Sequence, residues 1–345
     1  MGGGGTVGTR RAAAPAAPIR RIAVFVQNRA RFGTLVCHVP LIASLRRHYP
    51  AAHLTVVAPF AEASMLVGDQ LADELRRWPD SIWAQIRLTR ALAADLLITL
   101  RPASTFITML VGLSGARTRL GFDTPMGRPL LSSVRRRDLT IYRPLNYLRL
   151  VESLGVQPLL AETFVALADH VPPAIDPGNV NVCLMPGGAS PFKLWGIDNF
   201  LALAARIRAD RPDARFVFVL GPDERPLIDA IEASPLAAVS TMLNSPSLGA
   251  IAQAVMASRV TVANDCGPSH IAQLLGGAYV GVFANHRGQA ERIAGQWFFA
   301  RPGARWVSGP AGAPITELSP DEVYRSVEAV WPAAPADAAH SIGSR

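Results

Sequence analysis

Apolar runs alternate with amphipathic segments along the whole chain. Short apolar runs predict strands at residues 21–27, 53–58, 95–100, 181–187, 215–221, 259–265 and 279–284. Between them lie segments with helical periodicity, such as residues 35–50, where apolar side chains recur at Leu35, Val36, Val39, Ile42 and Leu45. Continuously apolar strands that alternate with helices are typical of parallel sheets covered on both faces.

A proline-rich segment divides this pattern into two similar halves. Residues 170–180 contain three prolines and a glycine, which break helices and suit a linker. With 345 residues, we therefore expect two doubly wound α/β domains, at 19–170 and 171–333, with ligands in the crevice beyond the carboxyl ends of their strands. Residues 1–18 are rich in Gly, Ala and Pro and predict a disordered arm. Residues 334–345 predict a disordered tail.

Composition narrows the class of protein. The three cysteines, Cys37, Cys183 and Cys266, show no C-x-x-C spacing, which speaks against a disulfide framework or a structural zinc site and favours a reducing compartment. The net charge of +8 favours acidic partners. Nucleic acid is not expected, because basic and aromatic residues are not interleaved. The most apolar later segment, residues 102–115, is too short to cross a bilayer.

Polar residues gather at the turn that follows the strand at 259–265. Asp265, Cys266, Gly267 and Pro268 lead into a helix that starts with Ser269 and His270. Free N–H groups at a helix start favour an anion, Gly267 permits close backbone approach, and the His270 imidazole can donate to a phosphate. We therefore expect a phosphate site. The alternative is a capped helix with a buried cysteine and a structural histidine.

Two further strand ends carry candidate ligands. The strand at 181–185 runs into a Pro-Gly-Gly loop, which brings Gly187, Gly188 and Ser190 close to Lys193, as a phosphate clamp would require. This loop has neither the Walker A spacing nor G-x-G-x-x-G, which weakens the NTPase and NAD-dependent oxidoreductase hypotheses. Beyond the strand at 215–221, Glu224 is a candidate for ribose hydroxyls or for helix capping.

The order of these motifs resembles a known family. "PGGASPFKLW", "GPDE" and "NSPSLGAIAQAVMASRVTVANDCGPSHIAQLLG" are similar to the carboxyl-terminal half of glycosyltransferase family 9, the ADP-heptose:lipopolysaccharide heptosyltransferases. "RIAVFVQNRARFGTLVCHVPLIASLRRHYPAAHLTVVA" and "DLLITLRPASTFITMLVGLSGARTRLGFD" resemble its amino-terminal half. The resemblance covers about residues 20–330.

The resemblance implies a GT-B fold, in which two Rossmann-like domains face each other across a cleft. The second domain would bind an ADP-sugar donor of the heptose type, and the first a glycan or anionic acceptor, by family default the lipopolysaccharide core. Transfer would proceed with inversion and without metal or cofactor, in a cytoplasmic enzyme at the inner membrane surface. The resemblance would place Lys193 on the donor phosphate and Glu224 on the ribose. Around the diphosphate-sugar it would place Asp265, Cys266, Gly267, Pro268 and His270.

One position departs from the family pattern. The family places Gly-Asp in its first loop, with the aspartate as general base, and this chain has Gly33–Thr34. Because a threonine cannot accept a proton near neutral pH, we consider His38 or Asp123 as the base, an acceptor that needs no base, or a loss of chemistry. Arg31 in the same loop is a candidate for binding an acidic acceptor. The alternative function is a non-catalytic nucleotide-sugar-binding homologue.

Overall fold

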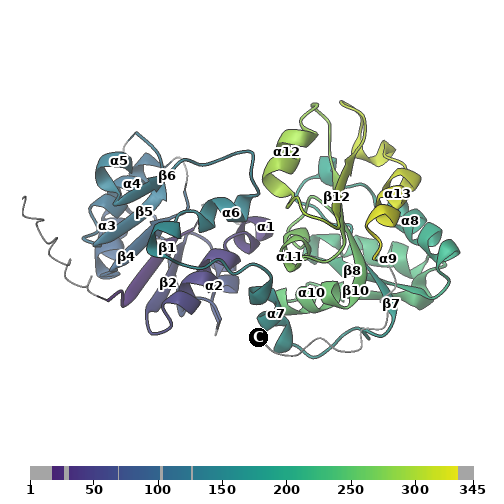
Figure 1. Ribbon diagram of the computed structural model, residues 1–345, viewed down its shortest axis with the longest axis horizontal. Helices are drawn as coiled ribbons and strands as arrows, with labels where there is room; N and C mark the ends of the chain where they lie inside the picture. Colours follow the sequence, from purple (N-terminus) through teal and green to yellow (C-terminus); the bar gives the residue numbers. More distant parts are fainter. Residues whose placement is uncertain (1–17, 27–30, 69, 102–103, 126, 333–345) are drawn as a thin grey trace, which may run out of the picture.

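The computed structural model describes residues 18–26, 31–68, 70–101, 104–125 and 127–332, which form two lobes side by side (Figure 1). The predicted tail and all but one residue of the predicted arm lie outside these ranges. The first lobe has a six-stranded sheet in the order β3-β2-β1-β4-β5-β6. Its strands are β1 (Arg21–Phe25), β2 (His53–Ala58), β3 (Glu74–Arg77), β4 (Leu96–Thr99), β5 (Thr118–Phe122) and β6 (Ser133–Arg135).

The second lobe repeats this arrangement with the order β12-β11-β10-β7-β8-β9. Its strands are β7 (Val180–Met185), β8 (Ala214–Leu220), β9 (Ser240–Asn244), β10 (Ser258–Asn264), β11 (Tyr279–Phe283) and β12 (Ala304–Ser308). The paired strands in both sheets are parallel. Counted within each lobe, both orders are 3-2-1-4-5-6, that of doubly wound dinucleotide-binding folds. The predicted fold class is confirmed.

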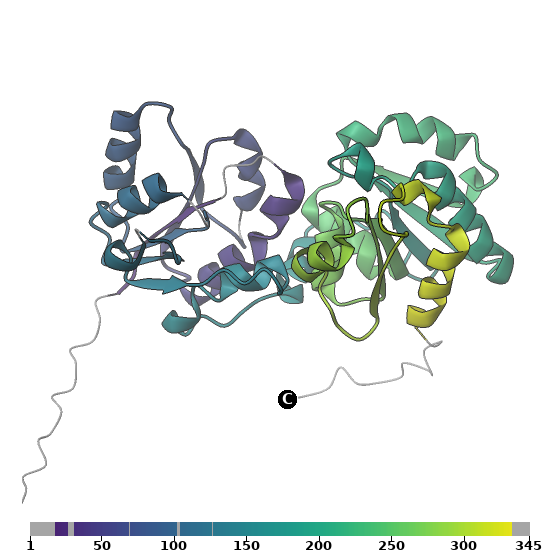
Figure 2. The same cartoon turned by 90° about the horizontal axis from the view of Figure 1, so that it is seen from above.

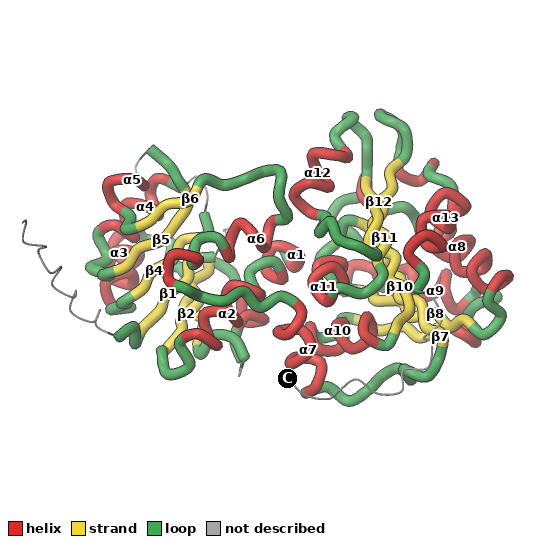
Figure 3. Tube along the Cα trace, viewed as in Figure 1, coloured by secondary structure: helices red, strands yellow, loops and turns green. Residues whose placement is uncertain are grey.

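Helices cover both faces of each sheet (Figure 3). Those of the first lobe are α1 (Phe32–Val36), α2 (Val39–His48), α3 (Ile82–Ala91), α4 (Thr105–Gly112), α5 (Gly127–Leu130) and α6 (Arg143–Leu148). The remaining helices are α7 (Ala161–Asp169), α8 (Ile197–Asp210), α9 (Pro226–Glu232), α10 (Leu248–Met256), α11 (Ser269–Leu275), α12 (Ala290–Trp297) and α13 (Pro320–Val330).

The central strand β1 shows why apolar runs form this sheet. Ile22 and Val24 pack into the core cluster on one face, whereas Ala23 and Phe25 pack into the cluster on the other. Side chains alternate between the two faces of a strand, so a strand buried on both faces must be apolar at every position.

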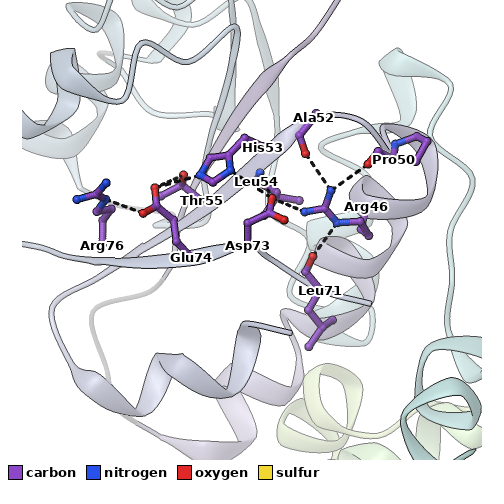
Figure 4. A network of polar contacts seen from close by, with 10 residues as sticks. All are labelled: Arg46, Pro50, Ala52, His53, Leu54, Thr55, Leu71, Asp73, Glu74 and Arg76. Atoms are coloured by element: carbon purple, nitrogen blue, oxygen red, sulfur yellow. Dashed lines mark hydrogen bonds and ion pairs between the residues drawn. The ribbon is translucent and has the colours of Figure 1, made fainter. Parts of the chain in front are cut away.

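The edge strand β3 is polar and was not expected from the apolar pattern. Its Glu74 lies next to Asp73, and both carboxylates belong to a network with neighbouring elements (Figure 4). Asp73 accepts hydrogen bonds from the Leu54 N–H at 2.6 Å and from Arg46 Nη2 at 2.5 Å, while Glu74 accepts one from the Thr55 hydroxyl at 3.1 Å. Charged contacts therefore hold an edge strand that has little apolar surface to bury.

The two lobes share part of their core. α7 precedes the predicted boundary at residue 170, yet it packs against α10 and α11 of the second lobe and also contacts α2. One apolar cluster continues from Leu35 in the first lobe to Met185 and Ile251 in the second. The chain thus crosses between the lobes before the proline-rich segment.

Candidate functional site

A cleft of about 960 Å³ lies between the lobes. From the first lobe its lining includes Arg31, Thr34, Arg101, Arg137 and Arg143. From the second lobe it includes Ser190, Lys193, Asp265, Cys266, Gly267 and His270. The turns that follow β7 and β10 both reach it, and these adjacent strands mark the point where the strand order reverses. This is the place where doubly wound sheets bind ligands.

Buried polar groups hold the Pro-Gly-Gly loop after β7. Asn264, at the end of β10 and fully buried, donates from Nδ2 to the Pro186 carbonyl at 2.6 Å and to the Gly187 carbonyl at 3.3 Å. On the far side of the loop the Trp195 indole donates to the Leu318 carbonyl at 2.7 Å. The β10 strand therefore sets the position of the loop that carries Lys193. Asn264 was not among the predicted site residues, although it directly precedes Asp265.

Glu224 lies beneath the same loop. Its Oε1 accepts from the Gly188 N–H at 3.3 Å, and its Oε2 accepts from the Gly221 N–H at 2.7 Å. A Cβ on Gly187 would lie 2.5 Å from Glu224 Oε1, so a glycine is required there. The carboxylate thus supports the loop through two backbone N–H groups, and a ribose hydroxyl would have to share its oxygens with them.

Lys193 and Asp265 form an ion pair at the floor of the cleft. Lys193 Nζ lies 2.5 Å from Asp265 Oδ2, and the aspartate side chain is only 7% exposed. A lysine has three N–H donors, so one contact with Asp265 leaves others for a bound phosphate. The pair joins the turns after β7 and β10.

The side chains around His270 set its tautomer. Its Nδ1 contacts the Tyr142 hydroxyl at 2.9 Å and Gln273 Nε2 at 3.5 Å. The Gln273 amide is oriented by its oxygen, which accepts from the Phe299 N–H at 2.7 Å, so its nitrogen faces the imidazole. Burial lowers the pKa of His270 to about 4. A neutral ring whose Nδ1 accepts carries its proton on Nε2, which suits a hydrogen bond to a phosphate oxygen.

The turn at Gly267 meets the first lobe backbone to backbone. A Cβ on Gly33 would lie 3.0 Å from Gly267 Cα, and a Cβ on Gly267 would overlap the Phe32 ring. Two glycines facing each other therefore allow α1 and α11 to close one side of the cleft. The neighbouring Cys266 is buried, and burial raises the pKa of its thiol to about 12. Pro268 directly precedes α11 and is not among the cleft-lining residues.

Arginines dominate the first-lobe side of the cleft. Arg101 donates from Nε to the Val26 carbonyl at 2.9 Å, while its buried Nη2 has no partner among the described residues. Arg143 donates to Gln296 Oε1 at 3.1 Å and lies 4.2 Å from the centre of the Trp297 ring, both on α12. Arg137 reaches the same Gln296 oxygen at 3.5 Å. This surface is built to hold an anion.

Of these arginines, only Arg31 was expected at the site. It is exposed at the start of α1 and lines the cleft. Arg101 directly follows the apolar run of β4, and a polar residue just beyond a strand end is the signal that could have identified it. Arg137 lies in the connection after β6 and Arg143 is the first residue of α6, and the sequence offered no such signal for them.

The structure argues against both candidate bases. Thr34 lines the cleft as expected, but His38 is fully buried, does not line it, and packs against the Tyr147 ring. His38 lies between α1 and α2, directly before the first residue of α2, and its ring is buried in the core instead of facing the cleft. Burial lowers the pKa of His38 to about 3. Asp123 is bound by both nitrogens of Arg128, at 2.9 and 2.8 Å, and is not among the lining residues.

Metal-ligating side chains are not clustered in the part of the chain that the structure describes: it contains no group of three His, Cys, Asp or Glu residues placed to hold an ion. Across those same residues, no helix is both long and apolar enough to cross a bilayer.

Comparison with known proteins defines the class. Residues 163–294 match the model of glycosyltransferase family 9 (heptosyltransferase). This region contains the turns with Lys193 and Asp265, and the match supports a glycosyltransferase. A search of curated protein sequences finds no match.

Solved structures support the same fold over nearly the whole chain. A family 9 glycosyltransferase from Veillonella parvula superposes with a TM-score of 0.67 at 18% identity, covering 92% of this chain and 99% of that one. E. coli ADP-heptose lipopolysaccharide heptosyltransferase II superposes with a TM-score of 0.63 at 18% identity, covering 90% of this chain and 98% of that one. E. coli heptosyltransferase WaaC with ADP superposes with a TM-score of 0.65 at 16% identity, covering 90% of this chain and 99% of that one. The chain therefore has the GT-B fold.

Proposed function

We propose that the protein transfers a heptose-like sugar from an ADP-sugar to an anionic acceptor, with inversion and without a metal. The observation that carries this proposal is the division of one cleft into two kinds of surface. The second lobe supplies a lysine–aspartate pair and a neutral histidine, and the first lobe supplies four arginines. The first set suits the diphosphate of a sugar nucleotide, and the second suits a charged acceptor.

The first chemical requirement is to stabilise the leaving group. Breaking the bond between the sugar and ADP leaves negative charge on the β-phosphate, which fixed donors and cations must stabilise. Lys193 Nζ, the Nε2–H of His270 and the N–H groups at the start of α11 are the groups that would do so. The E. coli heptosyltransferase WaaC was solved with ADP, which supports the choice of ADP as the nucleotide here.

The second requirement is to activate the acceptor oxygen that attacks the sugar. The first-lobe lining contains cations and Thr34 but no carboxylate or imidazole among the described residues. On the other side Asp265 is paired with Lys193, and the Nε2 of His270 already carries a proton. An acceptor whose oxygen is ionised when bound beside arginines would need no base, and transfer then involves only attack at the anomeric carbon and departure of ADP.

The missing base also favours a second candidate function, a nucleotide-sugar-binding protein without transferase activity. The two are separated by incubating the protein with ADP-heptose and a truncated lipopolysaccharide core in a chelating buffer, and measuring ADP release and the mass of the acceptor. A heptose added to the acceptor with inverted anomeric configuration supports transfer. Binding of ADP-heptose without product or ADP release supports the second candidate and contradicts the first.

We place the enzyme in the cytoplasm and at the inner membrane surface as part of the same proposal. An acceptor of the lipopolysaccharide type is anchored in that membrane, and the arginines of the cleft suit its phosphates.

A further inference from the structure

Two neighbouring helices of the first lobe expose large apolar side chains. On α3, Ile82 is 51% and Trp83 77% exposed, and on α4, Leu113 at the C-terminal cap is 62% exposed. Phe106 and Met109 complete a stripe on α4 at a spacing of three and four residues. Five of the nine large apolar side chains exposed in the described residues thus lie here. We call Ile82, Trp83, Phe106, Met109 and Leu113, with Arg87 and Arg90, the α3–α4 face.

The fold does not use this face. The opposite side of α4 places Ile107, Leu110 and Val111 in the core cluster beneath the sheet. α3 and α4 contact each other, and they lie at the outer end of the first lobe, away from the second (Figures 1 and 2). Large apolar side chains that are exposed together on adjoining helices are typical of an interaction surface.

The charge of the chain is concentrated around the same helices. Residues 75–137 contain eleven arginines and three aspartates, a net charge of +8, which equals the formal net charge of the whole chain. Two of the aspartates are already paired, Asp95 with Arg117 and Asp123 with Arg128, each at 2.8 Å. The rest of the protein is therefore neutral overall.

The arginines on α3 are placed to act together with its tryptophan. Arg87 and Arg90 follow Trp83 by four and seven residues, which puts all three on one side of the helix. Both arginines are exposed and form no ion pair with any carboxylate that the structure describes. An aromatic side chain flanked by unpaired arginines suits the boundary between lipid headgroups and acyl chains.

We propose that the α3–α4 face binds the surface of an anionic phospholipid bilayer, with its apolar side chains among the headgroups and Arg87 and Arg90 on the phosphates. A protein partner or a second copy would bury the apolar stripe equally well, but neither requires two unpaired arginines on the side of α3 that carries Trp83. Residues 1–17 contain only Met1 and Val7 as large apolar residues, too few to cover the stripe.

The face also has a route to the cleft. Ser104 caps the start of α4, accepting from the Ile107 N–H at 3.3 Å, and lines the cleft beside Arg101. The helix that would lie on the bilayer therefore begins at the arginine-rich side of the cleft. This step rests on the proposed function, because it connects the membrane with an anionic acceptor that has an apolar anchor.

The test is co-sedimentation of the full chain with vesicles of phosphatidylcholine alone or mixed equally with phosphatidylglycerol. We expect binding to the mixed vesicles and at least a tenfold weaker binding to phosphatidylcholine. Met109→Glu should weaken binding about tenfold, because it places a charge in the apolar stripe. Met256→Glu is the matched control, since Met256 is 51% exposed on α10 of the second lobe and Met109 is 41% exposed.

The charges are tested in the same assay. Replacing Arg87 and Arg90 together by glutamine should weaken binding to the mixed vesicles about 30-fold, since each arginine near an anionic surface contributes roughly a factor of five. The matched control replaces the exposed Arg215 and Arg325 of the second lobe, and it should change binding less than twofold.

Three outcomes would overturn the proposal. The first is no binding of the wild type to mixed vesicles, and the second is equal loss in the matched controls. The third is a dimer in light scattering that Met109→Glu converts to a monomer, which assigns the face to a second copy. ADP affinity, measured on the same samples by calorimetry, tests the proposed function separately: vesicle binding without ADP binding would contradict only that function.

Discussion

The two lobes have the same strand order, yet they bring opposite kinds of chemistry to the cleft between them. In the second lobe a single lysine is neutralised by Asp265, and buried polar groups such as Asn264 and Glu224 fix the surrounding loops. In the first lobe four arginines face the cleft without a lining carboxylate among the described residues. The shared fold therefore sets where ligands bind, and the residues at the strand ends decide which ligand each side accepts.

The largest expected effect is a loss of ADP affinity when the second-lobe side of the cleft is changed. Lys193→Ala removes the cation and leaves the buried Asp265 carboxylate unpaired, facing a diphosphate of the same sign. We expect ADP affinity to fall about 100-fold, or about 2.7 kcal/mol, in calorimetric titration.

The matched change in the first lobe is Arg101→Gln, which should leave ADP affinity within about threefold because Arg101 belongs to the acceptor side. Equal losses of ADP affinity in the two variants would show that the cleft is not divided between the lobes.

A second prediction concerns the contact between the lobes. Gly267→Ala places a methyl group against the Phe32 ring and 2.8 Å from the Gly33 N–H, so α1 and α11 must separate. We expect a loss of about 1–3 kcal/mol in the free energy of unfolding, measured by denaturant titration. Gly277→Ala is the control, because no atom lies within 4 Å of its added methyl. Equal stability of the two variants would mean that the lobes do not close on Gly267.

The last prediction is a pH dependence of stability. Burial lowers the pKa of His38 to about 3 and that of His270 to about 4, both below the ordinary value of 6.5. The unfolded chain therefore takes up protons first as pH falls, and stability present above pH 6.5 is lost between about pH 6.5 and 3, by at most about 1.4 kcal/mol per pH unit for each histidine.

His38→Leu should make this acid loss shallower. Neither imidazole nitrogen of His38 has a described hydrogen-bond partner, so the variant should be as stable as wild type near pH 7. Urea titrations at pH 7 and pH 5 measure this, with the exposed His170→Leu as control. An unchanged pH dependence in His38→Leu would contradict the assignment of the acid loss to this buried ring.

The sequence predicted the central strands and the turns after β7 and β10, because buried parallel strands are continuously apolar and a turn that binds phosphate needs glycine. It did not predict β3, β5, β6, β9 or β12. The edge strands β3 and β6, "ELRR" and "SVR", carry charge, and β3 is held by contacts such as Arg46–Asp73 that join distant residues.

Some residues of the site were predictable from the sequence, and others were not. Lys193, Asp265 and His270 follow strands of a recognisable pattern, and the structure brings all three to the cleft. His38 was placed there by its helical spacing from Thr34, but its ring packs in the core against Tyr147. Arg137 and Arg143 reach the cleft from the connection after β6 and from the start of α6, where they contact Gln296 and Trp297 of the other lobe. Only the three-dimensional packing of the lobes brings such residues together.

The most direct test of the divided cleft is a crystal structure of the protein grown with saturating ADP in a chelating buffer. We expect the diphosphate within hydrogen-bond distance of Lys193 Nζ and His270 Nε2, at the turn that starts α11, with Arg101 and Arg143 left free of the nucleotide. A diphosphate bound to the first-lobe arginines, or an empty turn at saturating ADP, would contradict it.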